Sequence, residues 1–128
     1  MDAKRLGYWT TTGLTALVML GSGLGKLTHQ QPLVESMEHL GYPEYLLTIL
    51  GIAYLAAAVV ILAPRLPRLK EWAYAGIIIA MFGAFASHLL VGDGVGQIAP
   101  AVLIAGLALG SYALRPDDRR LASPAEAR

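Results

Sequence analysis

His88 follows Ser87 in an apolar stretch of the chain, and its imidazole is the group there best suited to chemistry. From Trp72 to Val91 the sequence runs for about 20 residues without a formal charge, the length that a helix needs to cross a bilayer. Histidine titrates near neutral pH, so it can accept, donate or transfer a proton. An ionisable group at membrane depth is by default a candidate functional site, and we place that site at His88.

Lys26 is the second candidate, near the end of the first apolar stretch, with Ser22 one helical turn before it. Its ammonium could extend to the membrane surface, or it could be held over a ligand or beside a carboxylate. If the chain is an enzyme, we expect His88 as the catalytic base and Lys26 as its partner. If it binds a ligand, we expect Lys26 and His88 to donate hydrogen bonds, supported by Ser22, Ser87 and Tyr54.

The composition excludes several other kinds of chemistry. The chain has no cysteine, which rules out disulfides, thiolate catalysis and cysteine-ligated iron–sulfur clusters. His29, His39 and His88 are not spaced as zinc ligands, so we expect no metal site. His88 alone could ligate a haem, but nothing else in the sequence favours one. A net charge of +1, without a basic arm, gives no indication of nucleic-acid binding.

Four apolar segments must position these groups, at about residues 7–27, 45–62, 72–91 and 98–114. The chain is 55% hydrophobic and 15% charged, whereas a soluble domain carries about 25% charged residues. We therefore predict an all-α integral membrane protein, a four-helix bundle in the lipid bilayer. Residues Pro32–Leu40 predict a short amphipathic helix between the first two transmembrane helices, lying at the interface.

The cations predict the orientation of this bundle. They gather in residues 1–6, in the loop 65–70 and after residue 114, and four crossings bring these three groups to one side. The positive-inside rule makes that side cytoplasmic, so both termini are expected in the cytoplasm. The charged tail, residues 115–128, is expected to be flexible. Lys26 and His88 then lie together at the outer end, with the acidic loops.

The third apolar segment carries its small residues on one face. Gly76, Ala80 and Ala84 recur every four residues, and His88 continues the series. Such a face usually packs against another helix, so we expect His88 to point into the bundle. Glu71, at the start of this segment, is expected to favour the positive end of the helix dipole or to bind the basic loop.

Several short motifs resemble the DoxX-like family of small bacterial membrane proteins. They are Gly25-Lys26-Leu27, Gly41-Tyr42-Pro43, Glu71-Trp72-Ala73-Tyr74-Ala75-Gly76, Gly83-Ala84 and Ser87-His88. The resemblance covers about Gly7 to Leu114 and implies a multi-pass four-helix bundle in the inner membrane. Relatives in this family include a subunit of a thiosulfate:quinone oxidoreductase and membrane partners of thiol and oxidative-stress systems. Because this chain has no cysteine, a cysteine-based redox role does not transfer to it. Within the motifs, Glu71, Trp72, Gly76 and Gly83 are assigned structural roles.

We therefore expect an accessory inner-membrane protein that binds a small lipophilic ligand, of the quinone type, in the outer half of the bundle. One alternative is a membrane-embedded acid–base enzyme of the isomerase type acting on an apolar substrate. Another is a structural protein that self-associates through its small-residue faces, as a homo-oligomer or within a larger membrane redox complex. A quinone is the cofactor that this reading favours, and the sequence does not identify it.

Overall fold

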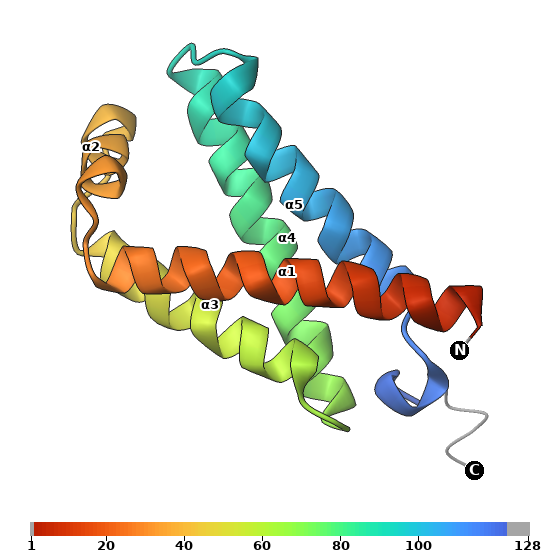
Figure 1. The fold of residues 1–128 in the computed structure, drawn as a ribbon. Coiled ribbons are helices and arrows are strands. Elements are labelled where there is room, and N and C mark those ends of the chain that lie inside the picture. The colour runs from red at the N-terminus through yellow and green to blue at the C-terminus, as the bar shows by residue number, and fades with distance from the viewer. Residues whose placement is uncertain (1, 123–128) are drawn as a thin grey trace.

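The computed structural model describes residues 2–122, which form five α-helices and one short 3-10 helix, without a strand (Figure 1). The all-α class predicted from the sequence is confirmed, as is the short helix between the first two long ones. In chain order the elements are α1 (Ala3–Leu27), α2 (Gln31–Leu40), α3 (Leu46–Leu62), α4 (Pro67–Leu90), α5 (Val95–Ala113) and η1 (Asp117–Arg119).

Local sequence explains why α1 and α4 begin earlier than predicted. α1 starts directly after Asp2, whose carboxylate accepts the backbone N–H of Arg5 at 2.7 Å and so caps the first turn. α4 starts at Pro67, because a proline has its φ fixed near the helical value and the first turn does not need its missing N–H. Leu66, with a φ of 55°, turns the chain sharply before it. The basic loop expected to run to Lys70 therefore ends at Leu66.

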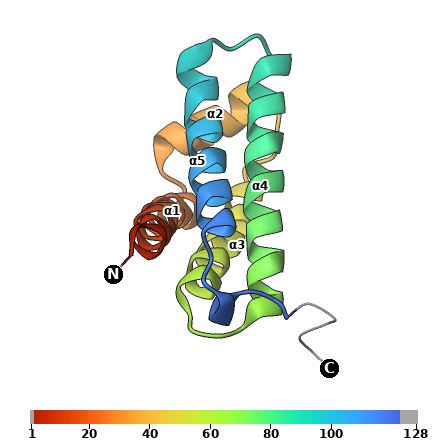
Figure 2. The same ribbon diagram turned by 90° about the vertical axis from the view of Figure 1, so that its right-hand side faces the viewer.

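The four long helices form two antiparallel pairs that cross obliquely (Figure 1). α1 lies along α3, and α4 lies along α5. In Figure 2 α1 is seen end-on while α4 and α5 stand upright, so the two pairs are not parallel. α1 also contacts α5, and α3 contacts α4, where the pairs cross. The buried apolar core lies at this crossing and includes Met19, Tyr54, Ala58, Ile61, Tyr74, Met81 and Ala108.

Two glycines allow α1 and α3 to approach closely. A Cβ atom added to Gly51 would lie 2.8 Å from Leu27 Cγ and 2.9 Å from the carbonyl oxygen of Gly23. A Cβ added to Gly23 would lie 3.0 Å from Leu55. The close contact of small residues expected for this fold is thus made by Gly23 and Gly51, whereas a Cβ added to Gly76 would meet nothing within 4 Å.

Two helices, α4 and α5, are long and apolar enough to cross a membrane. α3 is apolar, but its 17 residues span about 25 Å, less than the roughly 30 Å of a bilayer's hydrocarbon core. α1 is long enough, but it carries threonines, glycines and Lys26 along its length. The structure therefore supports a membrane protein with two helices of membrane-spanning length, and four crossings with cytoplasmic termini stay a prediction.

The segment after α5 packs against the end of the molecule that carries both termini. Arg119 is buried and donates to the Tyr8 hydroxyl at 3.2 Å. It also donates to the carbonyls of Ile61, at 3.3 Å, and Ala63, at 3.2 Å, where α3 ends. Arg119, in the segment predicted to be a flexible tail, thus contacts the helices, and residues 123–128 lie outside the described part.

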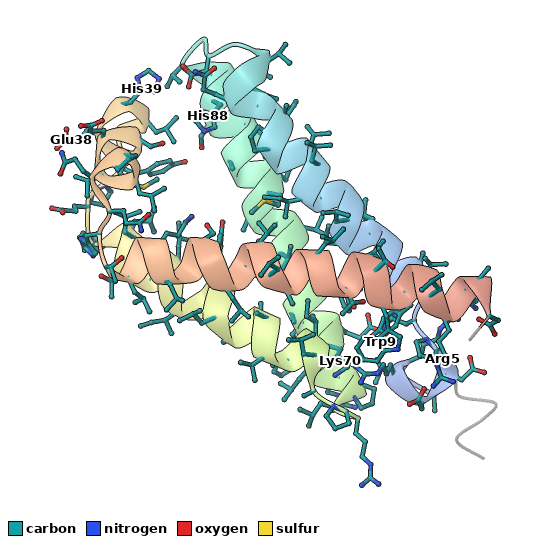
Figure 3. All side chains as sticks on the ribbon, viewed as in Figure 1. Arg5, Trp9, Glu38, His39, Lys70 and His88 are labelled. Carbon is teal, nitrogen blue, oxygen red and sulfur yellow. The ribbon has the colours of Figure 1, made fainter. Side chains whose placement is uncertain are left out.

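Lys70 contacts the same end of α3 from the first turn of α4 (Figure 3). Its ammonium donates to the carbonyl of Val60 at 2.7 Å and also to that of Ala63. The last carbonyls of a helix have no partner within the helix and carry the negative end of its dipole. Lys70 and Arg119 satisfy these carbonyls with positive charge, which ties α3, α4 and the C-terminal segment together.

Candidate functional site

A cavity of about 270 Å³ lies between α2, α3 and α4, at the end of the molecule away from the termini. Its wall is mainly apolar, with a few polar groups from α2, α3, α4 and the turn after α2. The lining residues include Leu40, Tyr42, Leu50, Tyr54, Ser87 and His88. Three of the residues predicted to bind a ligand, Tyr54, Ser87 and His88, therefore share one cavity.

His88 is held at this wall by Asp93, in the turn between α4 and α5. His88 Nδ1 lies 2.7 Å from Asp93 Oδ2, and His39 Nε2, from α2, lies 2.8 Å from Asp93 Oδ1. Figure 3 shows the two histidines facing one another across the gap between α2 and α4. The hydrogen bonds from His88 and from His39 hold the pKa of the Asp93 carboxyl below its ordinary value of 3.8. One carboxylate therefore joins α2 to the α4–α5 turn.

Tyr42 makes the second link between α2 and α4. Its hydroxyl lies 2.6 Å from Ser87 Oγ, and Ser87 in turn donates to the carbonyl of Gly83 at 2.7 Å. No residue of α2 is fully buried, and these side-chain bonds help to hold the helix over the cavity. Gly41, with a φ of 83°, supplies the turn that brings Tyr42 back toward α4.

Lys26 does not line this cavity. Its ammonium donates to Ser22 Oγ at 2.7 Å and lies 4.6 Å from the centre of the Tyr54 ring, where a cation is attracted to the aromatic face. Lys26 and Ser22 are thus linked to the cavity only indirectly, because Lys26 contacts the ring of Tyr54, which lines it. The cause is the oblique crossing: α1 packs on α3 and α5, and its end diverges from the end of α4 that carries His88 (Figure 1).

The expected pairing of Lys26 with His88 is therefore absent from the described residues. His88 faces α2 and Asp93 rather than a packed helix interface. On the small-residue face of α4, Ala80 and Ala84 are half-buried against the core, whereas Gly76 is exposed and a Cβ added to it would meet nothing within 4 Å. Within residues 2–122, no group of three acidic or histidine side chains is arranged to hold a metal ion.

An apolar groove of about 490 Å³ adjoins the cavity on the surface between α3 and α4. We call it the α3–α4 groove. Leu50, Tyr54 and Ala80 line both the cavity and the groove, so the two hollows share a wall. The groove is bordered by Gly76 and extends to the exposed Trp72 near the start of α4. Gly76 thus leaves open space along the groove rather than a helix contact.

Glu71 binds the C-terminal segment rather than the basic loop. Its carboxylate accepts from the Arg115 guanidinium at 2.6 Å and from the Tyr112 hydroxyl at 2.9 Å. Arg115 also lies 3.8 Å from the centre of the Tyr112 ring. These contacts join the start of α4 to the end of α5, which agrees with the structural role expected for Glu71.

A buried row of hydroxyls continues from this cluster into the core. Ser111 lies 2.6 Å from the Tyr74 hydroxyl and 2.5 Å from Thr12 Oγ1. All three residues are almost fully buried, and they come from α5, α4 and α1. Because a buried hydroxyl needs a partner, this row fixes how the three helices meet.

Sequence reasoning missed Tyr42, His39 and Asp93 as parts of the site. His39 is 54 residues from Asp93, and Tyr42 is 45 residues from Ser87, so no local spacing shows their contact. The available signals were Tyr42 in the Gly41-Tyr42-Pro43 motif and the expectation that the acidic loops lie at the outer end together with His88.

Comparison with protein families gives a match over most of the chain. The sequence model of a family described as the DoxX-like family matches residues 10–111. This confirms the resemblance that the motifs suggested. No curated protein and no solved structure matches the chain.

Proposed function

The chain belongs to the DoxX-like family, and we propose that it is an accessory protein of the bacterial inner membrane that binds a small lipophilic molecule of the quinone type. The polar head of the ligand would lie in the cavity beside Ser87 and His88, and its apolar tail in the α3–α4 groove. The observation that carries this proposal is the wall that the two hollows share at Leu50, Tyr54 and Ala80.

The dimensions and chemistry of the two hollows suit such a ligand. Cavities of about 150 Å³ hold a benzene ring, so the cavity of about 270 Å³ has room for one substituted ring. Its few polar groups, on a mainly apolar wall, can orient the ring in the way usual for small-molecule sites. The groove offers almost entirely apolar surface and lies open on the outside of α3 and α4, where a tail could enter from the bilayer.

In a membrane, the lipid bilayer would supply the lipophilic ligand. Four crossings with both termini in the cytoplasm would place the cavity in the outer half of the bundle, under the amphipathic helix α2. Lys26 would then act indirectly, because its ammonium rests on the Tyr54 ring, a wall of both hollows. Assembly as a homo-oligomer or within a larger redox complex stays a prediction.

Three glycines allow a matched test. Gly83 lines the cavity, Gly76 lines the groove, and Gly106 lies on the surface between α4 and α5. A Cβ added to any of the three meets nothing within 4 Å, so a leucine can be introduced at each without a clash at its Cβ. Lipophiles bound to the detergent-purified protein are extracted and identified by mass spectrometry.

We expect Gly83→Leu and Gly76→Leu to lower the retained ligand at least several-fold, because the added side chains occupy its head and tail positions. Gly106→Leu should retain the wild-type amount. Equal retention by all three variants, with unchanged thermal stability, would refute the proposed site.

A further inference from the structure

Two hydrogen-bond donors on the wall of the cavity, the hydroxyls of Ser87 and Tyr42, are already in use. Ser87 has one hydroxyl hydrogen, and it donates this hydrogen to the carbonyl of Gly83. In the short contact between Tyr42 and Ser87, the donor must then be the Tyr42 hydroxyl. Neither hydroxyl has a hydrogen left for a ligand, although the Tyr42 oxygen keeps a free lone pair.

The hydrogen bond to Asp93 also determines which nitrogen of the His88 ring carries a hydrogen. An ionised carboxylate can only accept hydrogen bonds, so Nδ1 of His88, 2.7 Å from Asp93 Oδ2, carries the hydrogen of that bond. In a neutral imidazole the other nitrogen, Nε2, then has no hydrogen. Among the described residues Nε2 has no hydrogen-bond partner, and His88 lines the cavity. The ring therefore offers an acceptor, supported from behind by a carboxylate.

We propose that the ligand held beside His88 is a hydroxyl donor, the phenol or hydroquinone form of a quinone-type molecule rather than the quinone. This inference rests on the proposed function and specifies the ligand's chemistry. A hydroquinone hydroxyl can donate to His88 Nε2, whereas a quinone carbonyl there would face a lone pair. Tyr54 and Ser36, elsewhere on the wall, have rotatable hydroxyls and can accept or donate to the rest of the ring.

Asp93 acts in this arrangement as a positioning residue. It touches no ligand, but it decides which nitrogen of His88 carries the hydrogen, as carboxylates commonly do for histidines. His39 binds the other oxygen of Asp93 and is 55% exposed, so it can be removed without changing the atom that His88 contacts. The pair of variants Asp93→Asn and His39→Ala therefore separates the choice of tautomer from the attachment of α2.

Three probes test the inference on the full-length protein in detergent micelles without oxygen: an alkyl-hydroquinone, its dimethyl ether, and the matching alkyl-benzoquinone. We expect the hydroquinone to bind roughly tenfold more tightly than the ether or the quinone, the effect of about one net hydrogen bond. Equal affinities for the three probes, all abolished by Gly83→Leu, would overturn the inference and leave the proposed function standing. Affinities that Gly83→Leu does not change would overturn both.

Nitrogen-15 spectra of histidine-labelled protein give a readout that a purely structural role would not move. We expect the His88 signals, assigned with the His88→Ala variant, to show hydrogen on Nδ1 and none on Nε2. In Asp93→Asn the amide can donate to Nδ1, so hydrogen should move to Nε2 and the hydroquinone preference should fall several-fold. His39→Ala should keep both the tautomer and the preference. An Nε2-protonated ring in the wild type, or an unchanged preference in Asp93→Asn, would overturn the inference.

Discussion

Replacing Gly51 by alanine should destabilise the protein, whereas the same change at Gly76 should stabilise it. Both glycines lie inside long helices, α3 and α4, so they share the same intrinsic cost. They differ only in their surroundings. The added methyl at Gly51 would meet Leu27 Cγ at 2.8 Å and the Gly23 carbonyl oxygen at 2.9 Å, while the methyl at Gly76 would meet open space.

The expected magnitudes follow from two opposing terms. A glycine-to-alanine change in a helix interior gains roughly 0.8–1.0 kcal/mol. Overpacking a close contact costs typically about 1–3 kcal/mol. At Gly51 two of the three nearest atoms belong to the backbone of α1, which cannot rotate away, so the cost should lie in the upper part of that range. We expect a net loss of about 1–2 kcal/mol at Gly51 and a gain of up to about 1 kcal/mol at Gly76.

The measurement is reversible unfolding in mixed micelles, followed by the helical circular dichroism signal as denaturing detergent is added. The two variants should shift the midpoint in opposite directions and differ by about 1–3 kcal/mol. If Gly51→Ala were as stable as Gly76→Ala, α1 and α3 could not approach as closely as the structure shows. The reasoning that assigns the tight helix contact to Gly23 and Gly51 would then be wrong.

Three further predictions use the same unfolding measurement. Ser111→Ala should lower the free energy of unfolding by about 1–3 kcal/mol, because it removes two buried hydrogen bonds. A variant as stable as the wild type would show that the row of hydroxyls does not stabilise the protein. Arg119→Ala should cost about 1.5–3 kcal/mol, because hydrogen bonds made by charged groups are the stronger ones. Arg68 is exposed, so the control variant Arg68→Ala should change the stability by no more than about 0.5 kcal/mol. Similar losses in the two variants would contradict the buried contact of Arg119. The pKa of Asp93 is lowered from 3.8, so its contribution is present above pH 3.8 and is lost as the pH falls through the lowered pKa. Asp93→Asn should remove this acid dependence, and an unchanged pH profile in that variant would refute the assignment.

The sequence by itself determined the helices and the family. Apolar length predicts four long helices near their observed positions, because the pattern along one helix is local. Capping by Asp2 and the first-turn position of Pro67 moved the starts of α1 and α4 by a few residues, a common uncertainty at helix ends. The sequence also selected Ser87, His88 and Tyr54, which share the cavity, since a polar residue in an apolar helix is visible without knowing its neighbours.

The tertiary structure alone decided which of these polar groups meet. The oblique crossing of the two helix pairs separates Lys26 from His88. The spacing of residues within one helix does not determine the angle at which it crosses another helix. The same crossing brings α2 over α4, so that Asp93 becomes the partner of His88 and His39 across separations of 5 and 54 residues. It also makes Gly51, rather than Gly76, the close contact, because the space around a glycine is set by the neighbouring helix.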